Sequence, residues 1–279
     1  MLLVQYYLLY EVDEMTDRKK YFINDDYTAN LAKLAAAATS NEELAKLCQR
    51  MYLADYINLE GMDLWLAKHA LTAVFRVLRQ YPALRRRIHY FGTLRGFAQR
   101  KDDLFAFLYP QSTGNDRRQV KEMTDQTVKG AQKSFEGLTL AIAFCATYGE
   151  MVFSGILLNE HQFDEQEVVY DLLYDVAIGH SPIGCSTVRA IVDHELGHLL
   201  DFWLDISDYS AFLETIRPLG AEYVGKNLSR YCANNGQIHY AEVLAEGFAE
   251  YRHNPNPRPI AKFVGRMVDQ EYQKMLKRL

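Results

Sequence analysis

The sequence feature that most constrains the fold is an HExxH motif inside an apolar stretch. The motif runs from His194 through Glu195 to His198, and residues 188–203 around it carry apolar side chains at helical spacing. Residues four apart in a helix lie on one face, so both imidazoles can reach one ion with Glu195 beside them. The segment therefore predicts a largely buried helix that presents two metal ligands and a carboxylate.

A catalytic zinc ion usually takes three protein ligands and one water, so a third ligand is expected elsewhere in the chain. Residues 240–251 form a second apolar segment in which Glu242, Glu246 and Glu250 share one helical face. Such carboxylates either face positive charge or form a solvated acidic surface. We take Glu242 as the third zinc ligand and Glu246 as the acceptor of a ligating histidine's free N–H. Spacing alone also allows Glu246 to be the third ligand in place of Glu242.

These segments resemble the gluzincin metallopeptidases, in which HExxH is followed downstream by ExxxD or ExxxE. Within that group the chain is similar to the anthrax lethal factor-like zincins, which phages and toxin systems often encode. The resemblance rests on residues 194–201, 228–235 and 242–251, and it covers the last two thirds of the chain. It implies a zincin-like fold, Zn²⁺ as the cofactor, and a peptide or protein as the substrate.

The resemblance also implies a tyrosine that hydrogen-bonds the tetrahedral intermediate from a position before the third ligand. Tyr231 is at the matching position, and Tyr240 is the alternative because it lies closer to Glu242 in the sequence. Asp201 falls on the histidine face of its helix and could orient a ligand there. Helix capping or a surface ion pair is an equal alternative for Asp201.

The expected reaction is hydrolysis of a peptide bond by a zinc-bound water that Glu195 deprotonates. One alternative is a non-catalytic or structural zinc-binding module of a phage or toxin system. Another is a regulatory protease that cuts a single protein. The intact Glu195 favours catalysis, because a module that only binds zinc has no need of a general base.

Composition and charge restrict the partners and the compartment. The 279 residues are 49% hydrophobic, and the formal net charge of −5 gives no electrostatic support for binding nucleic acid. The four cysteines form no CxxC pair, which favours free thiols in a cytoplasmic setting, namely a host cytoplasm or a virion if a phage encodes the chain. Residues 1–10 are apolar but too short to span a bilayer, so we expect a packed strand or helix and no membrane partner.

Apolar periodicity predicts an α+β fold with a small mixed sheet, the HExxH helix and a helical C-terminal half. We expect a helical N-terminal extension at residues 1–60 and a zincin-like domain at residues 61–279. The pattern predicts helices over residues 41–58 and 62–81, a strand over 87–92 and a mobile loop over 110–133.

Two further apolar runs, residues 138–148 and 151–159, flank a Gly149-Glu150 turn and predict a β-hairpin. Zincins hold their substrate as an added strand at the sheet edge beside the active-site helix. The resemblance therefore makes Met151–Leu158 the candidate edge. An ordinary buried hairpin is the alternative.

Overall fold

A computed structural model describes residues 35, 37–137, 139–162 and 165–278, so the apolar residues 1–10 lie outside the described part. The described part is a mixed α and β fold, as the sequence predicts. Its helices and strands are α3 (Asn41–Arg50), β1 (Tyr56–Asn58), α4 (Leu64–Gln80), β2 (Tyr90–Thr93), α5 (Leu94–Leu108), α6 (Gly114–Phe135), β3 (Ala141–Tyr148), β4 (Met151–Leu158), α7 (Glu165–Ala177), α8 (Val188–Leu204), α9 (Ser210–Ile216), α10 (Ala221–Asn227), β5 (Ala233–Asn234), β6 (Gln237–Ile238), α11 (Tyr240–His253) and α12 (Pro259–Leu276).

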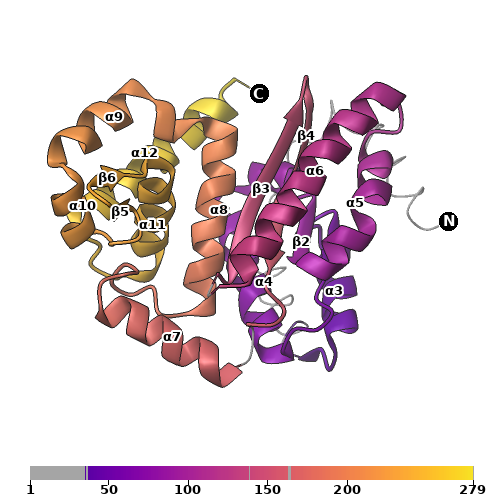
Figure 1. The fold of residues 1–279 in the computed structure, drawn as a ribbon, viewed down its shortest axis with the longest axis horizontal. Coiled ribbons are helices and arrows are strands. Elements are labelled where there is room, and N and C mark those ends of the chain that lie inside the picture. The colour runs from indigo at the N-terminus through magenta and orange to yellow at the C-terminus, as the bar shows by residue number, and fades with distance from the viewer. Residues whose placement is uncertain (1–34, 36, 138, 163–164, 279) are drawn as a thin grey trace.

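One small mixed sheet contains the first four strands in the order β1-β2-β4-β3. Strands β1, β2 and β4 run parallel, and β3 pairs antiparallel with β4. Side chains alternate along β4, so Phe153 and Leu157 pack with α5 and α6 while Ile156 and Leu158 pack with α4 and α8. Helices therefore cover both faces of the sheet (Figure 1).

The predicted hairpin is confirmed as β3 and β4, but the predicted edge is wrong. Met151–Leu158 is bordered by β2 on one side and β3 on the other, so β3 and β1 are the edge strands among the described residues. The pairing of β2 with β4 joins residues far apart in the sequence. A local apolar pattern does not reveal such a pairing, because each strand looks the same at an edge and inside a sheet.

The other differences between the predicted and the observed elements in the N-terminal half lie at the boundaries of short elements. The helix predicted over residues 62–81 is confirmed as α4, whose first turn is capped by the Asp63 side chain. The helix predicted over 41–58 ends at Arg50, and its last residues form β1. The predicted strand over 87–92 becomes β2, which begins later, after a 3-10 turn at Pro82–Arg87. The boundary between domains at residue 60 stays a prediction.

The mobile loop predicted over residues 110–133 is wrong, because residues 114–135 form α6. A capping box starts this helix: Thr113 Oγ1 accepts the Asp116 N–H, and the Asp116 carboxylate accepts the Thr113 N–H. Only a narrow stripe of α6, at Val120, Thr124 and Ala131, is buried. The polar composition reflects the wide solvated face of a helix that covers the sheet.

Helix α8 lies between the sheet and the helical C-terminal half, where α11 packs against it (Figure 1). The two helices approach closely at Gly197, where an added Cβ would lie 3.0 Å from the Ala245 Cα. The buried Asp193 carboxylate of α8 also accepts hydrogen bonds from Arg252 Nε at 2.8 Å and His253 Nε2 at 2.9 Å. These contacts fix α11 relative to α8.

Within the described part of the chain, no helix combines the length and the apolar character that crossing a membrane requires.

Candidate metal centre

Three of the predicted ligands come together between α8 and α11. The Glu242 Oε2 atom lies 3.3 Å from both His194 Nε2 and His198 Nε2, and the two imidazole nitrogens are 3.1 Å apart. Ligand atoms about 2.0–2.1 Å from a tetrahedral zinc ion are about 3.3 Å from one another. The triangle of donors therefore matches one face of a zinc coordination tetrahedron.

The donor set fits a divalent cation for a second reason. Glu242 Oε2 is buried and has no hydrogen-bond partner with acceptable geometry among the described residues. A buried carboxylate oxygen without a donor is costly in free energy, and a cation between it and the two imidazoles would satisfy it. The residues present therefore fit Zn²⁺, with His194, His198 and Glu242 as its ligands.

The same contacts shift two pKa values in the metal-free site. Burial acts to lower the pKa of His194, but the carboxylates of Glu242 and Glu246 raise it well above its ordinary value. Burial acts to raise the pKa of Glu242, but the imidazoles of His194 and His198 lower it well below its ordinary value. A proton therefore stays on the His194 imidazole, where a metal ion would compete with it.

The Glu195 carboxylate connects this centre to the edge of the sheet. Glu195 is buried, and its Oε2 atom accepts a hydrogen bond of 2.5 Å from the Ala143 N–H on β3. Leu140 O accepts the Asn159 N–H, and the direction of backbone groups alternates along a strand. The backbone N–H and C=O groups of even-numbered β3 residues therefore point toward β4, and those of odd-numbered residues point toward the outer edge. The predicted general base thus lies at the outer edge of the described sheet, next to a predicted histidine ligand.

Of the two candidate tyrosines, the structure brings Tyr231 to the centre. Its ring lies 6.1 Å from the His194 ring, and 41% of the residue is exposed. Burial, followed by the nearby carboxylates of Glu242 and Glu195, raises the pKa of the Tyr231 phenol. Tyr231 therefore keeps its proton and can donate it in a hydrogen bond. Tyr240 is partly buried against the hydrophobic core at the start of α11.

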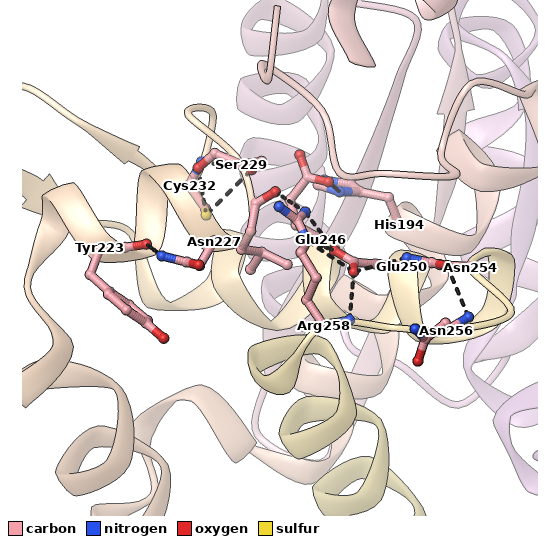
Figure 2. A network of polar contacts seen from close by, with 11 residues as sticks. His194, Tyr223, Asn227, Ser229, Cys232, Glu246, Glu250, Asn254, Asn256 and Arg258 are labelled. Atoms are coloured by element: carbon pink, nitrogen blue, oxygen red, sulfur yellow. Dashed lines mark hydrogen bonds and ion pairs between the residues drawn. The ribbon is translucent and has the colours of Figure 1, made fainter. Parts of the chain in front are cut away.

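The two predicted supporting carboxylates differ in their contacts. Glu246 is buried, and its Oε2 atom lies 3.8 Å from His194 Nδ1, within ion-pair range but longer than a hydrogen bond (Figure 2). Asp201 instead accepts the Ser207 N–H at 2.8 Å, just after α8 ends at the left-handed Asp205. This hydrogen bond holds the end of the helix, and orientation of a ligand by Asp201 stays a prediction.

Sequence reasoning gave no role to two contributors to this region, Arg258 and His180. Glu250 is fully buried and pairs with Arg258, which lies just beyond α11 (Figure 2). The signal in the sequence that points to Arg258 is a third glutamate on an apolar helix, because a buried carboxylate needs a cationic partner. The other contributor is His180, whose ring lies 5.4 Å from the Tyr231 ring in an edge-on arrangement. His239, by contrast, contacts the Asn234 side chain at an exposed position.

Comparisons of the chain with protein-family models, with curated proteins and with solved structures find no match.

Proposed function

We propose that the protein is a zinc-dependent metallopeptidase of the gluzincin type with a zincin-like fold. The observation that carries this proposal is the triangle of His194 Nε2, His198 Nε2 and the buried Glu242 Oε2, with the Glu195 carboxylate beside it. A structural zinc site usually has four protein ligands, whereas a catalytic one keeps a position open. Three donors next to a carboxylate favour catalysis.

Each residue has a role in peptide hydrolysis. When bound, zinc would lower the pKa of a water molecule and polarise the scissile carbonyl. Glu195 would take a proton from that water and return it to the leaving amine. The Tyr231 hydroxyl, which keeps its proton because its pKa is raised, would donate a hydrogen bond to the developing oxyanion.

We place the substrate along the free edge of β3 as an added strand. The backbone groups of odd-numbered residues face this edge, and the Ala143 N–H is already bonded to Glu195. The outward groups of Cys145 and Thr147 lie further along the same edge. Hydrogen bonds to them would supply affinity that does not depend on the substrate sequence.

The free thiols of Cys48, Cys145, Cys185 and Cys232 support a reducing, cytoplasmic setting for this activity.

Mass-spectrometric detection of cleavage in a diverse peptide library tests the proposal. Wild-type protein loaded with zinc is compared with Glu195→Gln, which keeps an oxygen to accept the Ala143 N–H but cannot act as a base. We expect the variant to bind zinc and to cleave about 10²–10⁴-fold more slowly. Equal cleavage by both proteins would overturn the role of Glu195. Zinc binding without cleavage by the wild type would instead support a non-catalytic zinc module.

A further inference from the structure

The segment that carries Tyr231 lies outside the helices and just before β5, where the Cys232 carbonyl accepts the His239 N–H at 3.0 Å beside the β5–β6 ladder. It lies between α10 and β5, and its backbone is held by neighbouring loops: Arg230 N–H donates to Gly179 O at 2.9 Å, and Tyr231 N–H donates to His180 O at 3.2 Å. Within the segment, the Cys232 N–H donates to Ser229 Oγ at 3.3 Å. Tertiary contacts therefore determine where the tyrosine hydroxyl lies.

A further contact on this segment comes from a buried ion pair (Figure 2). Glu250 is 0% exposed, and its Oε2 atom accepts from Arg258 Nη2 at 2.7 Å. Its Oε1 atom accepts from the Arg258 backbone N–H at 2.8 Å and from Arg258 Nε at 3.0 Å. The same Nη2 group of Arg258 also donates to the Leu228 carbonyl oxygen. One guanidinium therefore joins α11 to the chain three residues before Tyr231.

Helix α11 makes this connection relevant to the metal centre. Glu242, Glu246 and Glu250 follow one another at four-residue spacing on one face of a single helix. The first lies against both ligating imidazoles, and the second lies near His194 Nδ1. The third holds Arg258. A displacement of Arg258 would therefore move the tyrosine segment relative to a helix whose other end binds the metal.

We infer that Arg258 is a positioning residue for Tyr231: paired with Glu250, it sets the place of the tyrosine hydroxyl relative to the metal centre. The inference rests on the proposed peptidase function for its catalytic consequence. Arginine is required because its planar guanidinium can contact a carboxylate with two N–H groups and still donate to a carbonyl. A lysine ammonium keeps the charge but loses this fixed fork.

A double-mutant cycle tests the inference through activity. Tyr231→Phe removes the oxyanion donor, and we expect kcat to fall about 10²–10³-fold. Arg258→Lys misplaces the tyrosine, and we expect kcat to fall by up to about 10²-fold, with KM and zinc affinity unchanged. In the Tyr231→Phe background, Arg258→Lys should cause no further loss. Independent, multiplying losses would show that Arg258 does not act through Tyr231.

The matched control is Lys262→Gln, one turn further along α12, where the Lys262 ammonium donates to the exposed Asn256 side chain. It should leave kcat unchanged in both backgrounds. Circular dichroism melting checks that each variant is folded. If Arg258→Lys does not fold, Glu250→Gln replaces it, because the amide keeps one acceptor oxygen and loses the charge.

A second readout does not depend on catalysis. Fluorotyrosine placed at position 231 gives one ¹⁹F resonance, recorded with and without zinc. We expect Arg258→Lys to shift and broaden this resonance and Lys262→Gln to leave it unchanged. An unchanged resonance in Arg258→Lys would overturn the positioning role. If the wild type cleaves no peptide, the proposed function fails, while the ¹⁹F spectrum still decides the position of the tyrosine.

Discussion

At the scale of single residues, the proposed metal ligands would couple zinc binding to protonation. Zinc binds the neutral form of an imidazole, so a proton on His194 must leave before the metal can bind. Burial opposes that proton, but the Glu242 and Glu246 carboxylates outweigh burial and raise the pKa of His194. A raised pKa keeps the imidazole protonated to a higher pH. Competition by protons therefore begins above the ordinary histidine range.

We predict that zinc affinity falls steadily as the pH is lowered from about 8 to about 6. This range includes the ordinary histidine pKa of about 6.5 and extends above it. We also expect release of about one proton for each zinc bound at pH 7. Calorimetry in two buffers of different ionisation enthalpy measures both quantities. A pH-independent affinity with no proton released would contradict the pKa direction given for His194.

Substitution of the two glutamates on α11 distinguishes a ligand from a neighbour. Glu242→Ala removes a donor of the triangle and should reduce zinc affinity by more than about 100-fold, whereas Glu246→Ala should cost about 10–100-fold. A chelator competition assay measures both affinities. Glu222→Ala, in the exposed first turn of α10, is the matched control and should have no effect. A larger loss of zinc affinity in Glu246→Ala than in Glu242→Ala would make Glu246 the third ligand.

The relative positions of site residues that lie on one helix could be predicted from the sequence. His194, Glu195 and His198 lie on α8, and their common face follows from helical periodicity alone. The choices between Glu242 and Glu246, and between Tyr231 and Tyr240, depend on how α11 and the preceding loop pack. Nothing in the local pattern encodes those tertiary contacts. Arg258 was missed for the same reason, since its partner Glu250 lies on another helix.

At the scale of elements, the metal centre depends on the close crossing of α8 and α11. Gly197 lies at this crossing, where an added Cβ would be 3.0 Å from the Ala245 Cα and 3.4 Å from Phe248 Cδ1. Because two of the proposed ligands lie on α8 and the third on α11, any increase in the separation of the helices would open the triangle. The glycine inside the HExxH motif thus has a packing role.

We predict that Gly197→Val destabilises the protein by about 1–3 kcal/mol through overpacking and lowers zinc affinity at least tenfold. Urea unfolding and a zinc competition assay measure the two effects. Gly130→Val is the matched control, because nothing lies within 4 Å of a Cβ added at that helical glycine. Normal zinc affinity in Gly197→Val would show that the crossing tolerates a larger separation without loss of the site.

Elements with strong local signals were predicted well, and elements with weak ones were not. The α4 and α8 helices and the β3–β4 hairpin have clear apolar periods or a glycine turn. Helix α6 buries only a narrow stripe, so its polar composition looked like a loop. Strands β1 and β2 are short, and β2 leads directly into α5, which hides their boundaries.

At the scale of the whole molecule, helices cover both faces of the sheet, and β3 is an edge strand among the described strands. Helices α5 and α6 cover one face, and α4 and α8 cover the other (Figure 1). The β3 edge faces Glu195, and the C-terminal helices bring Glu242 and Tyr231 to the same centre. The edge could not be predicted, because it depends on the order of strands from distant parts of the chain.

Paired proline substitutions test the role of this edge. The Cys145 N–H faces outward, so Cys145→Pro should fold and raise KM for peptides about tenfold by removing a donor to an added strand. Ala146 pairs toward β4, opposite Phe153, so Ala146→Pro removes a sheet hydrogen bond and should destabilise the fold. Kinetics and thermal melting separate the effects. An unchanged KM in a folded Cys145→Pro would contradict strand addition at β3.

The most direct test is to titrate metal-free protein with zinc while following peptide cleavage by mass spectrometry. We predict no cleavage without metal and a linear rise in cleavage rate that stops at one zinc per chain in the wild type. Glu195→Gln should bind one zinc without a comparable rise. Cleavage that is independent of zinc, or equal in the wild type and Glu195→Gln, would contradict a metallopeptidase centred on His194, His198 and Glu242.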